Sequence, residues 1–243
     1  MPGFIVIPAR YGSTRFPGKP LALIAGKTLI QRVYERARQI RNADAVWVAT
    51  DDDRILHHVE TFGGRVLKTR GDFSTGTDRI AAALPEIESR EGRTCGRVIN
   101  LQGDEPLIDT GAVERLIDCL AEEGTDIATL ASPLQSPADF ENRDVVKVVT
   151  DLAGNALYFS RAPIPFSAPA DARRHVGIYA YKKRVIERLA SLPPSRLEKA
   201  ESLEQLRALQ NGFKIRVLEV AAPHLGVDRP EDIAKIEHEL ANR

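Results

Sequence analysis

The chain has 243 residues, of which 43% are hydrophobic and 28% charged, a composition typical of a folded globular protein rather than a disordered or fibrous one. Its 34 Lys and Arg residues balance 34 Asp and Glu residues, so no net charge favours non-specific binding to nucleic acid or to a membrane. The length allows one large α/β domain or two small ones, and any phosphate site must depend on a local cluster of cations.

Strand-like and helical segments alternate through the first half of the chain. The β-branched runs that predict strands are residues 4–7, 45–50, 64–68 and 97–102. The segments with helical periodicity lie near 28–40, 53–62, 76–90 and 110–121. This alternation predicts βαβ units and a parallel sheet flanked by helices. Such sheets bind ligands outside the carboxyl ends of their strands, so the residues that follow strands are the first candidates for a site.

The pattern changes after about residue 130. Strand-rich segments with prolines predict an antiparallel excursion or small subdomain, and they are residues 145–151, 155–166 and 174–183. The elements expected after them are helices at 183–191 and 198–211, a strand at 214–219 and a last helix near 230–241. Asp228 is a candidate N-cap for this last helix, with Pro230 in its first turn. We therefore predict a single domain, residues 1–243, with a strand-rich excursion at about 130–183.

The segment PARYGSTRFPGKP, residues 8–20, directly follows the first predicted strand. Its prolines limit the mobility of the loop, while Gly12 and Gly18 let backbone N–H groups approach a ligand closely. Fixed amides and concentrated cations suit a triphosphate with its roughly three to four negative charges. A surface loop with solvated cations is the alternative interpretation. The cations of this segment are Arg10, Arg15 and Lys19.

Several familiar motifs are absent. Gly26-Lys27-Thr28 resembles the end of a P-loop, but the glycine required five residues earlier is replaced by leucine at position 21. No G-x-G-x-x-G follows the first strand, which argues against an NAD-dependent oxidoreductase. Cys95 and Cys119 form no metal motif and are expected to be reduced thiols. With no signal-peptide pattern and no long apolar stretch, we expect a cytoplasmic protein.

Two later segments carry carboxylates that suit a metal ion. In VINLQGDEP, residues 98–106, an apolar strand leads directly into Asp104 and Glu105. A carboxylate at the end of a central strand suits Mg²⁺, because this hard cation prefers oxygen ligands and shares them with phosphates. In GVDRPED, residues 226–232, Asp228 either caps the last helix or joins Asp104 in a split metal site.

Two further segments have both a functional and a structural interpretation. Asp51-Asp52-Asp53 follows a strand and either binds a metal or caps the next helix. In STGTDR, residues 74–79, hydroxyls and free N–H groups either contact a base or a phosphate, or simply begin a helix. The pattern alone leaves both alternatives open.

Seven segments together indicate a family. They are PARYGSTRFPGKP, TGTDR, INLQGDEP, ALYFSRAPIPF, RHVGIYAY, LEKAESLEQLR and GVDRPEDI. In this order they resemble the CMP-Kdo synthetases (3-deoxy-manno-octulosonate cytidylyltransferases) and, more distantly, the CMP-sialic acid synthetases. The resemblance covers nearly the whole chain, and the shared order of seven motifs makes it specific.

The resemblance implies a Rossmann-like fold with a mixed, mostly parallel sheet flanked by helices, and a homodimer built partly by a small antiparallel subdomain. It implies an enzyme that uses CTP and Mg²⁺ to transfer CMP to the anomeric hydroxyl of a 3-deoxy-2-keto sugar acid, Kdo. Pyrophosphate would be released, and the product would serve lipopolysaccharide biosynthesis. Nucleotidyl transfer of this kind relies mainly on positioning and charge stabilisation.

The site residues follow by motif position. The catalytic residues would be Arg10, Lys19 and Asp104. The nucleotide would contact Arg10, Arg15, Lys19, Thr50, Asp51, Thr75, Gly76 and Arg79. The metal ligands would be Asp104 and Asp228. The sugar acid would contact Gln102, Arg161, His175, Tyr179, Glu201 and Gln205.

His175 has two interpretations. From its strand pattern alone it is more typical of a structural histidine, whereas the resemblance implies a hydrogen bond to the sugar. Tyr179, four residues further along the same predicted strand, is expected on the same face. Arg161 suits the sugar carboxylate because a guanidinium fork can bind both oxygens.

Two departures from the family pattern leave the sugar open. Where the family usually has Q-S-G-T, this chain has Ser74-Thr75-Gly76-Thr77, which keeps a hydroxyl but loses an amide. The segment between the PIPF and RHVG motifs, residues 167–173, is also shorter than in members of that family. It lies between two motifs that the resemblance assigns to the sugar. The alternatives are therefore 8-amino-Kdo or another acid sugar. A catalytically silent nucleotide-binding protein is a third reading, against which the retained motif cations and carboxylates argue.

Overall fold

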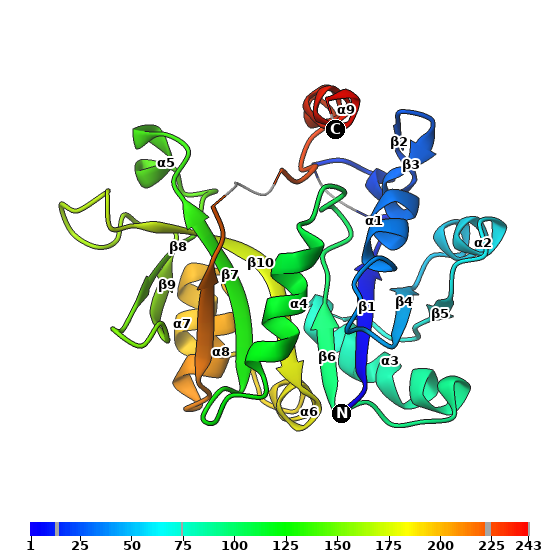
Figure 1. Ribbon diagram of the computed structural model, residues 1–243, viewed down its shortest axis with the longest axis horizontal. Coiled ribbons are helices and arrows are strands. Elements are labelled where there is room, and N and C mark those ends of the chain that lie inside the picture. The colour runs from blue at the N-terminus through cyan, green and yellow to red at the C-terminus, as the bar shows by residue number, and fades with distance from the viewer. Residues whose placement is uncertain (13–14, 74, 222–224, 243) are drawn as a thin grey trace. The chain divides into compact units, whose positions relative to one another are not determined.

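The computed structural model describes residues 1–12, 15–73, 75–221 and 225–242, and Figure 1 shows them. The chain divides into two compact units, of which unit 1 comprises residues 1–114 and 224–243 and unit 2 comprises residues 115–223. Both units combine strands with helices, and the mostly parallel α/β class predicted from the sequence is confirmed. The single domain with an excursion at about 130–183 remains a prediction.

Four parallel strands form the centre of unit 1. Their order is β6 (Arg97–Asn100), β1 (Gly3–Ala9), β4 (Ala45–Thr50) and β5 (Val66–Lys68). The side chains of Phe4 to Ile7 on β1 are fully buried, as expected for a parallel strand that is covered on both faces. The helices that follow these strands are α1 (Leu29–Ala37), α2 (Asp53–Thr61), α3 (Gly76–Glu91) and α4 (Thr110–Cys119).

Polar side chains fix where two of these helices begin. The Asp52 carboxylate accepts a hydrogen bond from Arg54 N at the start of α2, at 2.9 Å. The Thr75 hydroxyl accepts one from Asp78 N at the start of α3, at 3.1 Å. Both caps follow strands, so they hold the loops at the carboxyl ends of the sheet.

The segment after β1 contains three short elements near the C-terminal helix. They are the 3₁₀ helix η1 (Lys19–Leu21) and the paired strands β2 (Leu23–Ile24) and β3 (Lys27–Thr28). Helix α9 (Asp232–Ala241) lies beside this hairpin, where the Glu237 carboxylate accepts a hydrogen bond from Ala25 N at 2.7 Å (Figure 1). The C-terminal segment is thereby brought back to the segment 8–20 that begins at the end of β1, which we call the opening loop.

Unit 2 is built around β7 (Ile127–Pro133). This strand pairs in parallel with β11 (Ile215–Glu219) and antiparallel with β10 (Arg173–Lys182). A hairpin of β8 (Lys147–Thr150) and β9 (Ala156–Ser160) joins β10 through β8, as the predicted antiparallel excursion requires. The helices are α5 (Pro137–Glu141), α6 (Lys183–Ala190), α7 (Arg196–Glu201) and α8 (Gln205–Gln210).

Two sequence predictions about elements need correction, and one strand was missed. The single helix expected at 198–211 is two helices, because Ser202 adopts the left-handed region with φ +54° and ends α7. The last helix begins at Asp232, and Asp228 does not cap it; instead the Asp232 carboxylate accepts from Asp228 N at 3.0 Å. Strand β7 was not predicted, since its run IATLASP lies where the alternation was thought to end.

Among the described residues, every helix is too short or too polar to cross a membrane.

Candidate functional site

A cavity of about 190 Å³ opens at the carboxyl ends of the unit 1 strands. It is lined by residues from the end of β1, the loop before α3, the start of α3 and the segment after β6. The lining residues are Pro8, Ala9, Arg10, Phe73, Thr75, Gly76, Arg79 and Gln102. Five of the residues predicted from the sequence therefore share one cavity, at the edge of the sheet where such folds bind ligands.

Lys19 lies among three oxygen atoms from distant parts of unit 1. Its Nζ donates to the Asp104 carboxylate at 2.7 Å and to the Val227 carbonyl at 2.8 Å. An Asp228 carboxylate oxygen is 4.0 Å from the same Nζ and 3.6 Å from the Arg15 guanidinium. The structure thus brings Asp104 and Asp228 to one cation, the convergence that a split metal site requires.

The donor set around this ammonium fits Mg²⁺. Two carboxylates and a backbone carbonyl are hard oxygen ligands, and two carboxylates leave room for phosphate oxygens to complete the coordination. No group of three or more His, Cys, Asp or Glu side chains with metal-binding geometry occurs in the part of the chain that the structure describes. A metal here would therefore depend on its phosphate ligands.

Arg10 is exposed on the wall of the cavity and has no carboxylate partner among the described residues. Its charge is therefore available for a phosphate rather than neutralised by the protein. Ser13, Thr14 and Ser74 of the neighbouring motifs lie outside the described residues.

Arg79 joins three segments at one side of the cavity. Its guanidinium is buried and donates to the Thr69 hydroxyl and to the Asp51 carboxylate, both at 2.6 Å. Thr50 is fully buried, and its hydroxyl accepts from Asp52 N at 3.2 Å. Arg79, Asp51 and Thr50 therefore hold the loops together in this structure, and their predicted contact with the nucleotide remains a prediction.

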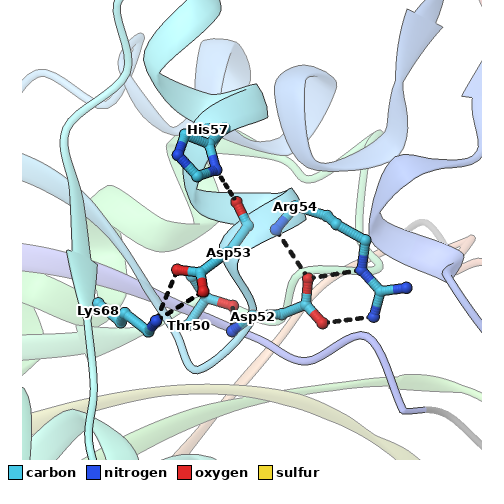
Figure 2. Close-up of polar contacts among 6 residues, drawn as sticks. All are labelled: Thr50, Asp52, Asp53, Arg54, His57 and Lys68. Carbon is cyan, nitrogen blue, oxygen red and sulfur yellow. Dashed lines mark hydrogen bonds and ion pairs between the residues drawn. The ribbon is translucent and has the colours of Figure 1, made fainter.

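The Asp51–Asp53 cluster is not a converging acidic site, and Figure 2 shows two of its members, Asp52 and Asp53. Asp52 caps α2 and pairs with Arg54, and Asp53 accepts two hydrogen bonds from Lys68 Nζ at 2.6 and 2.8 Å. Asp51 pairs with Arg79 instead. Because each carboxylate faces a different cation, the capping interpretation is confirmed and the metal interpretation is not supported.

Phe73 lines the cavity although no sequence pattern indicated it. Its ring centre lies 5.3 Å from the Arg79 guanidinium carbon, so the aromatic face and the buried cation form adjoining parts of one wall. A single aromatic residue in a loop carries no spacing signal. Only the folded loop shows that it faces the cavity.

Arg161 and Glu201, both predicted sugar contacts, form one bonded group in unit 2. The Glu201 carboxylate accepts from the Ser160 hydroxyl at 2.7 Å and from Arg161 N at 2.9 Å. The Arg161 Nε donates to the Glu201 carbonyl at 2.9 Å. The carboxylate of Glu201 therefore orients the backbone and side chain of Arg161.

Lys147 is a buried support for this group that the sequence patterns did not indicate. Its Nζ donates to the carbonyls of Asn142, Val145 and Arg161 at 2.9, 2.7 and 2.7 Å. Burial lowers the pKa of Lys147. A charge this well enclosed is tolerated only because carbonyl oxygens surround it.

His175 and Tyr179 lie side by side on β10, as predicted, with ring centres 5.3 Å apart. The strand has a bulge between Val176 and Tyr179, so four residues of β10 are opposite two of β7. The two extra residues leave the alternation of faces unchanged. The rings of Phe159 and His175 are also in contact, with centres 5.0 Å apart.

His175 is expected to make stability depend on pH. Burial lowers its pKa from 6.5 to about 3, so between these values the unfolded chain binds more protons than the folded chain. The free energy of unfolding should therefore rise with pH through this window. As the pH falls below 6.5, the contribution that His175 makes to it is progressively lost. The His175 Nε2 lies 3.0 Å from the Thr129 hydroxyl. Replacing His175 with Gln, which keeps a hydrogen-bonding group for Thr129, should reduce the loss of unfolding free energy between pH 7.5 and 5 by up to about 2 kcal/mol. Urea unfolding of both proteins at each pH measures this, and identical losses would contradict it.

Gln205 and Tyr179 line a cavity of only about 40 Å³ in unit 2. The cavity is too small for a sugar acid, so their contact with one stays a prediction. A larger hollow of about 220 Å³ in unit 1 lies at the amino end of β4 and includes Tyr34, Arg38 and Asp44. It shares no residue with the predicted site, so its larger volume does not make it the candidate site.

Comparisons with known proteins show the family to which the chain is similar. The family model described as cytidylyltransferase matches residues 4–215. The 3-deoxy-manno-octulosonate cytidylyltransferase of Thermodesulfovibrio yellowstonii is 50% identical over 94% of both chains, and that of Syntrophotalea carbinolica is 50% identical over 97% of both. A solved structure of CMP:2-keto-3-deoxy-manno-octonic acid synthetase complexed with CTP is 45% identical in sequence, with a TM-score of 0.91. The superposition covers 100% of this chain and 99% of that one. The structure of 4-diphosphocytidyl-2C-methyl-D-erythritol synthase, at 14% identity and a TM-score of 0.69, shares the fold.

Proposed function

The chain belongs to the cytidylyltransferase family, and from this premise we propose that it transfers CMP from CTP to 3-deoxy-manno-octulosonate and releases pyrophosphate. The observation that carries the proposal is the arrangement of Arg10, Lys19 and Asp104 at one end of the unit 1 sheet. Relatives about 50% identical over nearly their full length carry the name of this activity. The name of the product links the reaction to lipopolysaccharide biosynthesis.

The opening loop supplies the positive charge for the triphosphate. Arg10 has no carboxylate partner among the described residues, and Lys19 extends from the other end of the loop to Asp104. As the bond between the α- and β-phosphates breaks, negative charge grows on the leaving pyrophosphate. Fixed cations stabilise that charge without having to reorganise, which is the main way a protein accelerates such a transfer.

Asp104 and Asp228 would hold Mg²⁺, with the Val227 carbonyl nearby. When bound there, the ion supplies a Lewis acid that offsets charge on the triphosphate. Lys19 bonds to the Asp104 carboxylate and the Val227 carbonyl in this structure and lies 4.0 Å from Asp228, so its ammonium has to share or leave Asp104 for a metal to bind. Lys19 would then be free to contact the phosphates.

Unit 2 would bind the sugar acid. Arg161 is oriented by Glu201 and by the buried Lys147, and an oriented guanidinium suits recognition of a carboxylate. The rings of His175 and Tyr179 lie side by side in the same unit, and the His175 ring contacts Phe159, two residues before Arg161 in the chain. Gln102, another predicted sugar contact, lines the unit 1 cavity, and its contact with the sugar stays a prediction.

An assay of pyrophosphate release tests the function directly. The protein is incubated with Mg²⁺, one nucleoside triphosphate and one acid sugar, and the panel includes Kdo, 8-amino-Kdo and sialic acid. We expect pyrophosphate release with CTP and Kdo. Release should be much slower when UTP or ATP replaces CTP. Activity with another sugar alone would contradict Kdo as substrate, and no activity with any pair would contradict the proposed reaction.

We also propose that the protein works in the cytoplasm as a homodimer, and that the β8–β9 hairpin contributes to the dimer. Two leucine side chains of this hairpin are exposed to solvent, Leu152 fully and Leu157 by 61%. Exposed apolar side chains on one projecting hairpin are typical of a protein interface. The buried thiols of Cys95 and Cys119 fit a reducing compartment.

Replacing both Leu152 and Leu157 with Asp should convert a dimer into a monomer. Two buried carboxylates would oppose association by several kcal/mol, because they lose their hydration without gaining a partner. Sedimentation equilibrium of the variant and the wild-type protein measures the mass. Leu23→Asp is the matched control, because Leu23 is similarly exposed in unit 1 at 65%. An unchanged dimer in the double variant, or a monomeric wild-type protein, would contradict the proposal.

A further inference from the structure

Arg54 connects the start of α2 to the opening loop that carries the phosphate-binding cations. Its guanidinium carbon lies 3.3 Å from the centre of the Tyr11 ring, a stacked cation–π arrangement. Tyr11 directly follows Arg10 in the chain, and Arg10 lines the nucleotide cavity. A helix that contributes no residue to that cavity thus contacts the loop that does.

Asp52 holds the Arg54 side chain in place (Figure 2). Its Oδ1 accepts from Arg54 Nε at 3.0 Å and its Oδ2 accepts from Arg54 Nη2 at 2.6 Å, which fixes the plane of the guanidinium. The pKa of Asp52 is lowered, first of all by the hydrogen bond from this side chain. Asp52 itself is tied to the end of β4, because its N–H donates to the Thr50 hydroxyl. The stacking surface presented to Tyr11 is therefore anchored to the sheet.

Tyr11 in turn fixes the other end of the opening loop. Its carbonyl accepts from Gly18 N at 2.9 Å. Gly18 has φ +74°, and a Cβ added there would lie 3.0 Å from the Tyr11 Oη, so only glycine fits against the ring. Lys19 follows directly and reaches Asp104. One aromatic side chain therefore contacts the segments that carry both Arg10 and Lys19.

The contacts among Asp52, Arg54 and Tyr11 are expected to affect the conformation of the opening loop more than the stability of the whole chain. An exposed arginine–carboxylate pair contributes little to the free energy of unfolding of the whole chain. Holding a loop in its binding conformation has a larger effect on affinity, because a loop that must become ordered on binding reduces the affinity for the ligand.

We propose that Arg54, oriented by Asp52, is a positioning residue that stacks on Tyr11 and keeps the opening loop in the conformation that receives the triphosphate of CTP. This inference rests on the proposed function, because it requires CTP to bind in unit 1. It assigns a role in nucleotide affinity to a side chain outside the nucleotide cavity.

Titration calorimetry with CTP and Mg²⁺ tests the proposal. Arg54→Met should raise the Kd for CTP about three- to tenfold, the range expected for one lost cation–π contact. Because the loss affects binding, kcat at saturating CTP should change by less than about twofold, and the melting temperature should stay within about 2 °C. Arg54→Lys keeps a cation and should bind CTP with intermediate affinity. Tyr11→Phe keeps the ring and should resemble the wild-type protein.

A double-mutant cycle separates this role from a general structural one. Tyr11→Leu should weaken CTP binding like Arg54→Met, and the double variant should be no weaker than the weaker single variant, because both changes remove the same contact. Arg90→Met is the matched control, since Arg90 also pairs with a helix carboxylate, Glu86, and lies over an aromatic ring, that of Trp47. Wild-type affinity in Arg54→Met, or additive losses in the double variant, would overturn the inference. Failure of the wild-type protein to bind CTP would instead refute the proposed function.

Discussion

Replacing Asp104 with Asn is expected to abolish CMP transfer while the fold is preserved. Asn has nearly the same size, but it is a neutral and much weaker ligand for a hard cation and cannot neutralise Lys19. Loss of the metal's charge stabilisation should lower kcat/KM by at least about 10³-fold. Asp104 is partly exposed and its ion pair with Lys19 is a single contact, so the melting temperature should change little.

Two measurements accompany this variant. Steady-state kinetics at several Mg²⁺ concentrations give the loss of activity, and calorimetric titration with Mg²⁺ and CTP gives the loss of metal affinity. Asp109→Asn is the matched control, because Asp109 lies in the same segment after β6 and its carboxylate accepts from Ala112 N, at 3.2 Å. The control should keep near-normal activity. Near-normal, Mg²⁺-dependent turnover by Asp104→Asn would contradict the metal assignment.

Replacing Lys19 with Met is expected to lower kcat by about 10²- to 10³-fold, the usual effect of removing one fixed donor to a developing anion. Met keeps the length of the side chain but loses the ammonium that lies between Asp104 and Val227. The loss should appear mainly in kcat rather than in KM for CTP, because the leaving pyrophosphate carries more negative charge in the transition state than in bound CTP.

Lys27→Met is the control for this variant. Lys27 is an exposed lysine of the same unit and pairs with Glu35 at 2.6 Å. Pyrophosphate release by the control should match that of the wild-type protein. A Lys19→Met protein with wild-type kcat and only a raised KM would show that the ammonium acts in ground-state binding.

The alternation of apolar runs predicted the elements of unit 1 well. The strand expected at 45–50 has the same bounds in the structure, and α2 and α3 begin at the expected residues. These segments have strong local signals: β-branched runs in the strands, and a polar N-cap at each helix start. The helix expected at 198–211 shows the limit of such signals, since its periodicity continues through Ser202 while the backbone does not.

The candidate site was predictable in its residue types but not in its contacts. Asp104 and Asp228 are far apart in sequence, and their spacing left open whether Asp228 caps the last helix or shares a metal site with Asp104. The fold brings the C-terminal segment back to Lys19, which bonds to the Val227 carbonyl, and it shows that Asp228 does not cap the last helix. Metal binding by Asp104 and Asp228 stays a prediction. Contacts such as that of Arg54 with Tyr11 join segments that have no shared pattern, so only the fold reveals them.

A crystal structure of the protein with CTP and Mg²⁺ tests the central claim most directly. The account predicts the triphosphate between Arg10 and Lys19, with a metal ion bound by Asp104 and Asp228 and by phosphate oxygens. The base should occupy the cavity lined by Phe73 and Thr75. CTP bound away from the opening loop, or a metal that contacts neither carboxylate, would contradict it.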